Sequence, residues 1–297
     1  MNSPLVTADA AGTWQLGDLT VSRLGFGAMR LTGDWTGSGP PSDRDQSVAV
    51  LRRAVDLGVN HIDTAAFYFS PLQSANELIS TALGPYPDDL VIATKVGPSR
   101  DAHGAWQGMA RPDQLRGQVE ENLRQLGRDH LDLVNLRTLS VSMPVGEHFA
   151  ALAELRDAGL IRCLGLSNVT VEQIDEALEI APVATVQNRY SIDSRRPEAD
   201  EVLSACATRG IAFVPFFAIA GRGREDGRSA GELEPVLAAA RAHEATPAQV
   251  RLAWTLAQGS HVLAIPGTGS LTHLAENVAA GALRLTGEEL ALLGSLA

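Results

Sequence analysis

Short apolar segments alternate with longer amphipathic segments along the whole chain. This alternation is typical of repeated βα units that wind around a parallel sheet. Each apolar segment is about the length of a buried strand, and each amphipathic segment is long enough to return the chain to the other end of the sheet. We predict eight strands, at 24–28, 59–63, 90–95, 131–137, 161–167, 183–187, 211–216 and 262–265.

Helices are predicted between these strands, for example at 45–57, 113–126, 145–158, 171–178 and 247–257. Eight such repeats in 297 residues fit the α/β class and one (β/α)8 TIM barrel domain, residues 1–297, since about 250 residues are typical. A doubly wound open sheet is the alternative. It is disfavoured because Gly25-Phe26-Gly27 is not followed by the third glycine of a dinucleotide-binding turn.

Two short apolar segments precede the first predicted strand. Residues 14–16 and 19–21 flank Gly17-Asp18, a pair typical of a tight turn between antiparallel strands. We therefore expect an N-terminal β-hairpin, which could close the bottom of the barrel.

Charge limits the partners of this protein. The chain has 35 acidic and 24 basic residues, a net charge of -11, which argues against nucleic acid and anionic membranes. No apolar run reaches the roughly 20 residues that cross a bilayer, and residues 1–14 lack a signal-peptide pattern. We expect a cytoplasmic protein with a small-molecule ligand; the sequence leaves its oligomeric state open.

The two cysteines and the histidines indicate no metal site. Cys163 falls in a predicted strand and Cys206 in a predicted helix, without a CxxC spacing. We expect both thiols to be reduced and buried, and no bound metal.

Polar residues stand where the predicted strands end, and in a barrel of this type those ends form the active site. One of them, Lys95, is the only lysine among the 24 basic residues. Arginine serves every other lysine-or-arginine position, which suggests that this position needs a compact ammonium. The count alone leaves open that a composition poor in lysine retained one by chance. The set comprises Asp63, Lys95, Arg137, Ser167, Asn168, Gln187 and Phe216.

Several motifs in order make the chain resemble the aldo-keto reductase superfamily over nearly its whole length. They are Leu24-Gly25-Phe26-Gly27, residues 58–65 followed by Tyr68, Ala93-Thr94-Lys95, Gly165-Leu166-Ser167-Asn168, Gln187-Asn188 and Ile265-Pro266-Gly267-Thr268. The resemblance implies hydride transfer from a reduced nicotinamide to a carbonyl, with Tyr68 donating the proton to oxygen.

A tyrosine hydroxyl ordinarily holds its proton until about pH 10, so it needs help to act as an acid near neutrality. A unit positive charge about 4 Å away contributes about 4 kcal/mol at an effective dielectric near 20. By resemblance, Lys95 is that cation and Asp63 its ion-pair partner.

One position departs from the common family pattern. The strand 131–137 ends in Arg137, where the family usually has histidine. Arginine does not act as a general acid, but it can hydrogen-bond and polarise a carbonyl oxygen. Together with residues 27–31 and 213–217, this arginine resembles the pyridoxal reductase branch.

The resemblance also implies cofactor contacts. Ser167, Asn168 and Gln187 would bind the nicotinamide carboxamide, and Phe216 would stack on its ring. Gly267 and Thr268 would meet a phosphate, while His273, Glu276 and Asn277 would contact the adenosine end. NADPH is expected over NADH. Arg222 and Arg224 are either solvated loop residues or part of an arm over the cofactor.

In barrels of this kind, the loops at the mouth determine the substrate specificity. Trp35 and Trp106 could stack on a carbonyl substrate, and the branch resemblance implies reduction of pyridoxal to pyridoxine. Three alternatives stay open: a reductase of another small carbonyl, for example in secondary metabolism; a Schiff-base aldolase using Lys95; and a catalytically weak NADPH-binding sensor.

Overall fold

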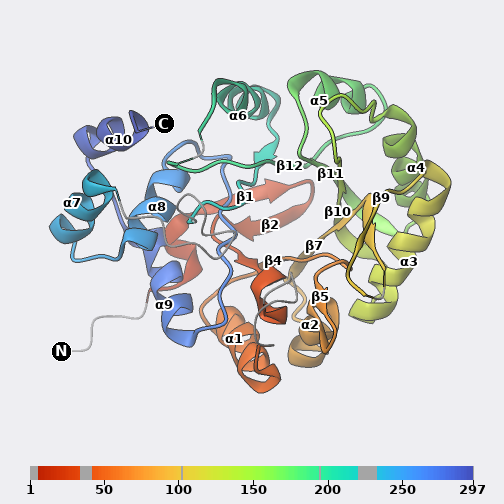
Figure 1. The fold of residues 1–297 in the computed structure, drawn as a ribbon, viewed down its shortest axis with the longest axis horizontal. Helices are drawn as coiled ribbons and strands as arrows, with labels where there is room; N and C mark the ends of the chain where they lie inside the picture. Colours follow the sequence, from red (N-terminus) through yellow and green to blue (C-terminus); the bar gives the residue numbers. More distant parts are fainter. Residues whose placement is uncertain (1–5, 34–41, 102, 194, 220–232, 297) are drawn as a thin grey trace.

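The computed structural model describes residues 6–33, 42–101, 103–193, 195–219 and 233–296. Seven parallel strands form one curved sheet, and their order across the sheet is their order along the chain (Figure 1). This arrangement confirms the predicted α/β barrel. The strands are β3 (Phe26–Gly27), β4 (His61–Asp63), β7 (Val91–Val96), β10 (Leu131–Arg137), β11 (Ile161–Ser167), β12 (Thr185–Gln187) and β13 (Ala212–Phe213).

The barrel closes through residues 262–264, which were predicted as the eighth strand. Val262 bridges to Phe213 and Ala264 bridges to Leu24, both in parallel. These contacts are isolated bridges and not a continuous strand. Backbone hydrogen bonds flank each bridge, for example from the Leu263 amide to the Phe213 carbonyl and from the Gly25 amide to the Ala264 carbonyl. The Val262 carbonyl accepts instead from the Arg23 side chain (Nε to O, 3.1 Å). The first and seventh strands, which border this seam, are likewise shorter than predicted.

Helices cover the outside of the barrel (Figure 1). Side-chain caps set several of their starts: Asp43 accepts from the Gln46 amide, and Thr170 and Thr246 each form a capping box. The barrel helices are α1 (Arg44–Asp56), α2 (Ala75–Leu83), α3 (Leu115–Leu126), α4 (Gly146–Asp157), α5 (Val171–Leu178), α6 (Pro197–Arg209), α8 (Pro247–Leu256) and α9 (Leu271–Ala279). Two more, α7 (Glu234–Ala242) and α10 (Gly287–Gly294), lie beside α8.

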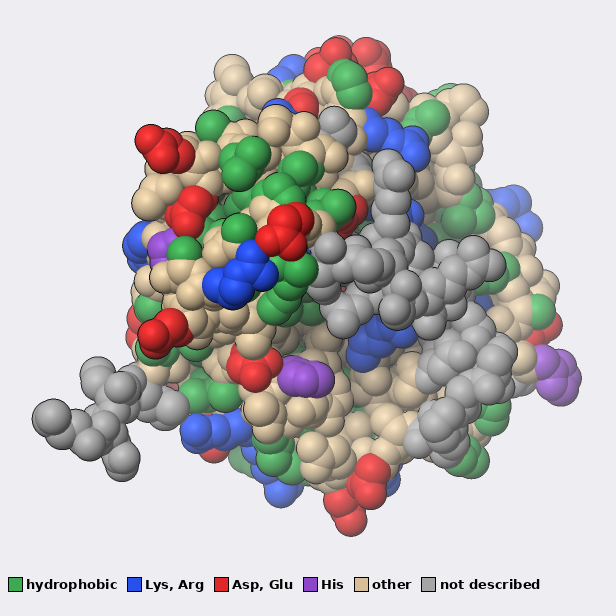
Figure 2. Space-filling model, turned by 60° about the vertical axis from the view of Figure 1, so that its left-hand side comes forward, with side chains coloured by type: hydrophobic (Ala, Val, Ile, Leu, Met, Phe, Trp, Pro, Cys, Tyr) green, Lys and Arg blue, Asp and Glu red, His purple; other side chains and the backbone are tan. Residues whose placement is uncertain are grey.

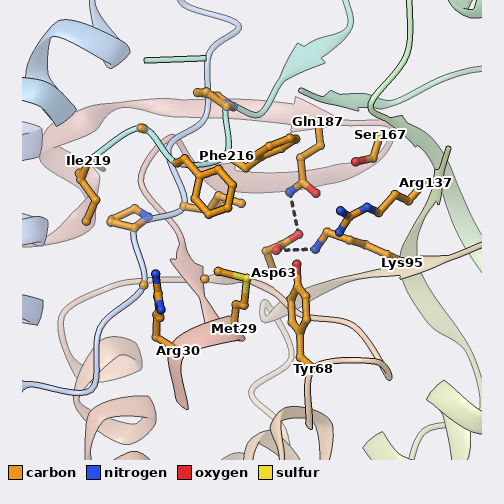
Figure 3. Close-up of a pocket in the computed structure, with 17 residues that line it drawn as sticks. Met29, Arg30, Asp63, Tyr68, Lys95, Arg137, Ser167, Gln187, Phe216 and Ile219 are labelled. Carbon is orange, nitrogen blue, oxygen red and sulfur yellow. Dashed lines mark hydrogen bonds and ion pairs between the residues drawn. The ribbon is translucent and has the colours of Figure 1, made fainter. Parts of the chain in front are cut away.

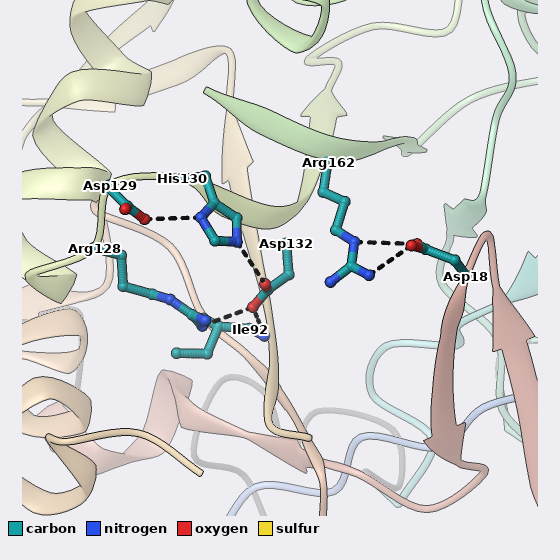
Figure 4. Close-up of polar contacts among 7 residues, drawn as sticks. All are labelled: Asp18, Ile92, Arg128, Asp129, His130, Asp132 and Arg162. Atoms are coloured by element: carbon teal, nitrogen blue, oxygen red, sulfur yellow. Dashed lines mark hydrogen bonds and ion pairs between the residues drawn. The ribbon is translucent and has the colours of Figure 1, made fainter. Parts of the chain in front are cut away.

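The predicted hairpin is present and closes the bottom of the barrel. Strands β1 (Thr13–Leu16) and β2 (Leu19–Ser22) pair antiparallel, and Leu16 and Val21 are buried against the barrel interior. The turn is held from outside by a fork from Arg162, whose Nη2 lies 2.6 Å and Nε 3.1 Å from the two Asp18 carboxylate oxygens (Figure 4). The guanidinium accordingly lowers the pKa of Asp18.

Two further hairpins lie beside the barrel mouth, in segments where no strands were predicted. They are β5 (Phe69–Ser70) with β6 (Gln73–Ser74), and β8 (Pro98–Arg100) with β9 (Trp106–Met109). The second is formed because the Asp101 carboxylate accepts the amides of His103 and Ala105 and so shapes a turn. Local turn chemistry, and not strand periodicity, produces these elements.

The barrel interior contains one buried histidine. His61 is 4% exposed, and among the described residues neither ring nitrogen has a hydrogen-bond partner. Burial lowers the pKa of His61 to about 4, and the nearby backbone of Ser22 offsets a smaller part of that decrease. His61 is therefore a neutral core residue.

On the face of the molecule in Figure 2, acidic and basic side chains are interspersed among apolar ones. None of the helices in the described ranges has both the length and the apolar character needed to cross a membrane. Both cysteines are free and buried, and burial raises the pKa of Cys206 to about 12.

Candidate functional site

The strand register collects the predicted polar residues at one end of the barrel. Asp63 at the end of β4 pairs with Gly27 of β3. Arg137, which ends β10, pairs with Ser167 of β11, and Ser167 pairs with Gln187 of β12. Because parallel strands end at the same rim, these side chains surround one opening.

A cavity of about 360 Å³ lies at this rim (Figure 3). Of the predicted site residues, eight line it: Asp63, Tyr68, Lys95, Arg137, Ser167, Gln187, Phe216 and Gly267. The other lining residues are Gly27, Met29, Arg30, Pro215, Phe217, Ala218, Ile219, Ile265 and Pro266.

A buried ion pair lies at the floor of the cavity. Lys95 Nζ is 2.6 Å from Asp63 Oδ1 and also donates to the Thr64 carbonyl at 3.0 Å. Lys95 is 3% and Asp63 5% exposed, so little water screens the pair. The ammonium lies 4.9 Å from the centre of the Tyr68 ring. A fixed positive charge thus stands beside a tyrosine that faces the cavity.

Gln187 connects this ion pair to the cavity. Its Nε2 donates to Asp63 Oδ2 at 2.8 Å, which orients the amide. Its Oε1 is buried and has no hydrogen-bond partner among the described residues. An orphaned buried acceptor is costly unless a ligand supplies an N–H, as a carboxamide would. The nearby Ser167 hydroxyl and the ring of Phe216 complete a set that fits a nicotinamide.

Arg137 lies on the adjoining wall of the cavity, next to Lys95 (Figure 3). Its guanidinium carbon lies 5.8 Å from the centre of the Phe67 ring. Phe67 in turn packs edge-on against Tyr68 at 5.2 Å, and its ring is 5.6 Å from that of Trp106. Trp106 is 44% exposed and does not line the cavity itself, so it supports the wall from behind.

Gly267 lines the cavity at a point where its backbone runs close to that of Gly27. A side chain at Gly267 would place its Cβ 2.4 Å from the Gly27 carbonyl oxygen. A Cβ does not come this close to a backbone oxygen, so this approach requires glycine at position 267.

The remaining predicted cofactor residues lie outside the cavity lining. Asn168 has a left-handed backbone (φ 63°), and its side-chain amide donates to the Thr138 carbonyl at 3.2 Å, which forms a turn after β11. Thr268 accepts from the Ser270 amide. His273, Glu276 and Asn277 lie on α9, which begins just after this segment. Trp35, Arg222 and Arg224 fall outside the described residues.

Sequence reasoning gave no site role to Met29, Arg30, Pro215, Ile219 and Phe67. The first four line the cavity, and Phe67 backs it. Their positions in the sequence could have indicated a place in the site, because Met29 and Arg30 follow the first strand and Pro215 and Ile219 lie near the end of the seventh. Apolar residues at strand ends are ambiguous, however, because most of them fill cores.

Within the described parts of the chain, no group of three or more histidine, cysteine, aspartate or glutamate side chains could hold a metal ion.

Comparisons with known proteins agree with this geometry. Residues 23–297 match the model of the aldo/keto reductase family. Pyridoxine 4-dehydrogenase of Escherichia coli is 41% identical over 293 residues, covering 97% of this chain and 99% of that protein.

Solved structures are also similar. A thermostable aldo-keto reductase, solved with the inhibitor epalrestat, superposes with a TM-score of 0.80 at 31% identity, covering 96% of this chain and 99% of that one. An aldo-keto reductase from Klebsiella pneumoniae in complex with NADPH has a TM-score of 0.75 at 30% identity and covers 93% of this chain and 91% of that one.

The family match and the full-length relatives decide against the aldolase alternative and support the use of a nicotinamide cofactor. The chain belongs to the aldo/keto reductase family and is an NAD(P)H-dependent oxidoreductase.

Proposed function

We propose that this enzyme reduces pyridoxal to pyridoxine with NADPH. The observation that carries the proposal is the buried Lys95–Asp63 pair beside Tyr68, with Arg137 on the adjoining wall of the same cavity. The Escherichia coli relative, named pyridoxine 4-dehydrogenase, supports this choice of substrate.

In this proposal the bound cofactor supplies the hydride. Ser167 and Gln187 hold its carboxamide, and Phe216 packs on the nicotinamide ring, which fixes the face presented to the carbonyl. Tyr68 gives its phenolic proton to the carbonyl oxygen as negative charge develops there. The Lys95 ammonium stabilises the resulting phenolate, and Asp63 and the Thr64 carbonyl keep that ammonium in place.

Arg137 takes the place of a neutral hydrogen-bond donor in this scheme. Its guanidinium presents several N–H groups in a planar fork. It donates to the carbonyl oxygen and polarises the C=O bond before hydride arrives. Arg137 thus assists Tyr68 without giving up a proton.

The preference for NADPH is also proposed. Gly267 has no room for a basic side chain, so recognition of the 2′-phosphate falls to α9, where His273 is exposed. The Klebsiella pneumoniae neighbour was solved with NADPH, which supports the assignment. A higher kcat/KM with NADPH than with NADH at a fixed aldehyde concentration is the expected result.

The direct test is the rate of NADPH consumption with pyridoxal, with pyridoxine identified as the product by chromatography. We expect saturable turnover and equal amounts of pyridoxine and oxidised cofactor. Turnover of other aldehydes without pyridoxal would restrict the proposal to an unspecified carbonyl reductase. Tight NADPH binding without turnover of any carbonyl would favour the sensor alternative.

Replacing Tyr68 by phenylalanine tests the acid. The ring and its packing on Phe67 remain, while the proton donor is lost. General acid catalysis contributes roughly 100-fold to 10,000-fold, so we expect kcat to fall by about that factor. NADPH affinity, measured by quenching of protein fluorescence, should change little. Near-normal turnover would remove Tyr68 from the mechanism.

A further inference from the structure

The side chains that line the cavity carry more positive than negative charge. Four of its lining residues are ionic: Arg30, Asp63, Lys95 and Arg137. Lys95 and Asp63 cancel each other at 2.6 Å, which leaves two arginines. Arg30 lies on the far side of the cavity beside Met29, while Arg137 lies next to Lys95 (Figure 3). In a chain of net charge -11, the reacting end of the cavity is therefore cationic.

The Arg137 side chain is held but its charge is not neutralised. Its backbone, at the end of β10, is paired with Ser167 at the end of β11, and its guanidinium carbon lies 5.8 Å from the centre of the Phe67 ring. In the described ranges, no carboxylate forms an ion pair with it. A half-buried guanidinium without a counter-ion has donors for more than one acceptor, in a planar fork.

A single carbonyl oxygen would engage only one arm of that fork. An aldehyde with a hydroxyl or phenolate oxygen on the adjacent ring carbon presents two oxygens in one plane, spaced for two parallel N–H···O bonds. Pyridoxal has this arrangement, with its aldehyde next to a ring hydroxyl. In its phenolate form the neighbouring oxygen would also supply a counter-charge to the guanidinium.

From this geometry we propose that Arg137 selects aromatic aldehydes that bear a hydroxyl or phenolate oxygen ortho to the carbonyl. One guanidinium arm binds the carbonyl oxygen and the other binds the ortho oxygen. The inference rests on the proposed carbonyl reductase function and names the substrate class of that site.

The test uses the intact enzyme with NADPH and four aldehydes of similar size: benzaldehyde, 2-hydroxybenzaldehyde, 4-hydroxybenzaldehyde and 2-methylbenzaldehyde. The para isomer controls for ring electronics, and the methyl compound controls for an ortho substituent without an acceptor. A charge-assisted hydrogen bond predicts a kcat/KM for the ortho isomer roughly 10-fold to 100-fold above that for the para isomer.

Two variants assign the preference to Arg137. Arg137→Met removes the fork at similar length, and the ortho-to-para ratio should fall close to one even if all rates drop. Arg137→Lys keeps the charge without the fork and should retain only part of the ratio. Arg30→Met is the matched control, because it removes the other arginine of the cavity and should leave the ratio unchanged.

The outcomes separate the two proposals. Reduction of all four aldehydes with an ortho-to-para ratio near one would overturn the inference and leave the reductase in place. The same holds for a ratio that survives in Arg137→Met or collapses equally in Arg30→Met. No turnover of these aldehydes or of pyridoxal would instead refute the proposed function.

Discussion

The two ends of the Gln187 amide differ in their contacts. The nitrogen donates to the Asp63 carboxylate, whereas the oxygen is buried and has no hydrogen-bond partner among the described residues. Only the nitrogen of an amide can donate to a carboxylate, so the contact with Asp63 fixes the orientation of the Gln187 amide. The remaining oxygen can then only accept a hydrogen bond from a donor. Under the proposed function, cofactor binding and the orientation of Asp63 would therefore be linked through this one side chain.

Replacing Gln187 by glutamate breaks this link in a pH-dependent way. A second carboxylate would face Asp63 at hydrogen-bond distance, and the repulsion would pull Asp63 from Lys95. We expect kcat to fall at least about tenfold at alkaline pH and to recover partly as the pH is lowered, since protonation restores a donor.

The measurement is kcat against pH for this variant, wild type and Gln187→Met, together with NADPH affinity. Gln187→Met has no titratable group and should be impaired at every pH. Parallel profiles for Gln187→Glu and Gln187→Met would contradict the link.

His61 predicts how stability depends on pH. The folded protein holds its imidazole neutral down to about pH 4, whereas in the unfolded chain it binds a proton near pH 6.5. Between these values the unfolded state binds more protons, so the free energy of unfolding falls as the pH falls, by about 3 kcal/mol in total. Above pH 6.5 this residue contributes no pH dependence.

Urea unfolding of wild type and His61→Leu between pH 7 and pH 4 measures this effect. The variant lacks the titrating group, so its free energy of unfolding should fall less steeply as the pH is lowered. The difference between the two slopes should be about 1 kcal/mol per pH unit. His103→Leu, at an exposed position, is the control and should follow wild type. An unchanged slope in His61→Leu would exclude His61 as the source.

Among the elements, β7 and β10 pair as parallel strands, and one carboxylate adds a side-chain contact between them at the base of the barrel. Asp132 of β10 is 3% exposed, and its Oδ2 accepts from the Ile92 backbone amide at 2.8 Å and from Arg128 at 2.7 Å (Figure 4). The side chain thus replaces a ladder contact at the start of the neighbouring strand. This junction lies at the end of the strands opposite the active site.

Asp132→Ala would leave a buried amide and a guanidinium without their acceptor. Breaking such a pair costs about 3 kcal/mol, so we expect a clear drop in the urea midpoint. Because the cavity is at the other rim, kcat of the folded variant should stay within about twofold of wild type. Asp129→Ala, with a side chain 94% exposed, is the control and should change neither quantity. A loss of kcat without a loss of stability would refute this purely structural role.

For the whole molecule, the seam between the first strand and the segment 262–264 decides whether the barrel closes. Gly27 and Gly267 approach each other so closely that a Cβ on either would meet backbone, at 2.7 Å from the Ile265 oxygen for Gly27 and 2.4 Å from the Gly27 oxygen for Gly267. Backbone cannot move aside as a side chain can. The cofactor-facing rim and the closure of the barrel therefore depend on the same two glycines.

Gly267→Ala would force this seam apart. Overpacking of this kind costs about 2 kcal/mol or more, which lowers Tm by several degrees, and NADPH affinity should fall as well. Gly269→Ala is the matched control, since nothing lies within 4 Å of a Cβ there. Equal Tm and NADPH affinity in the two variants would show that the seam tolerates a side chain.

The spacing of apolar residues along the chain predicted the strand order, the hairpin and the bounds of α5. These features could be predicted because the apolar pattern within each element indicates which of its faces is buried. The same spacing overestimated the strands at the seam, where the Arg23 side chain takes a carbonyl from far along the chain. It also missed the short hairpins at the mouth, which depend on turn contacts such as those of Asp101.

Strand periodicity and local motifs lie in consecutive residues, so they were enough to predict the barrel class and the residue types at the strand ends, including the sole lysine. The contacts of those side chains are a property of the folded chain. Folding brings Gln187 to Asp63 across 124 positions, places Asn168 in the turn after β11 and sets Arg137 beside Phe67. Such contacts depend on the register between distant strands, which local sequence does not encode.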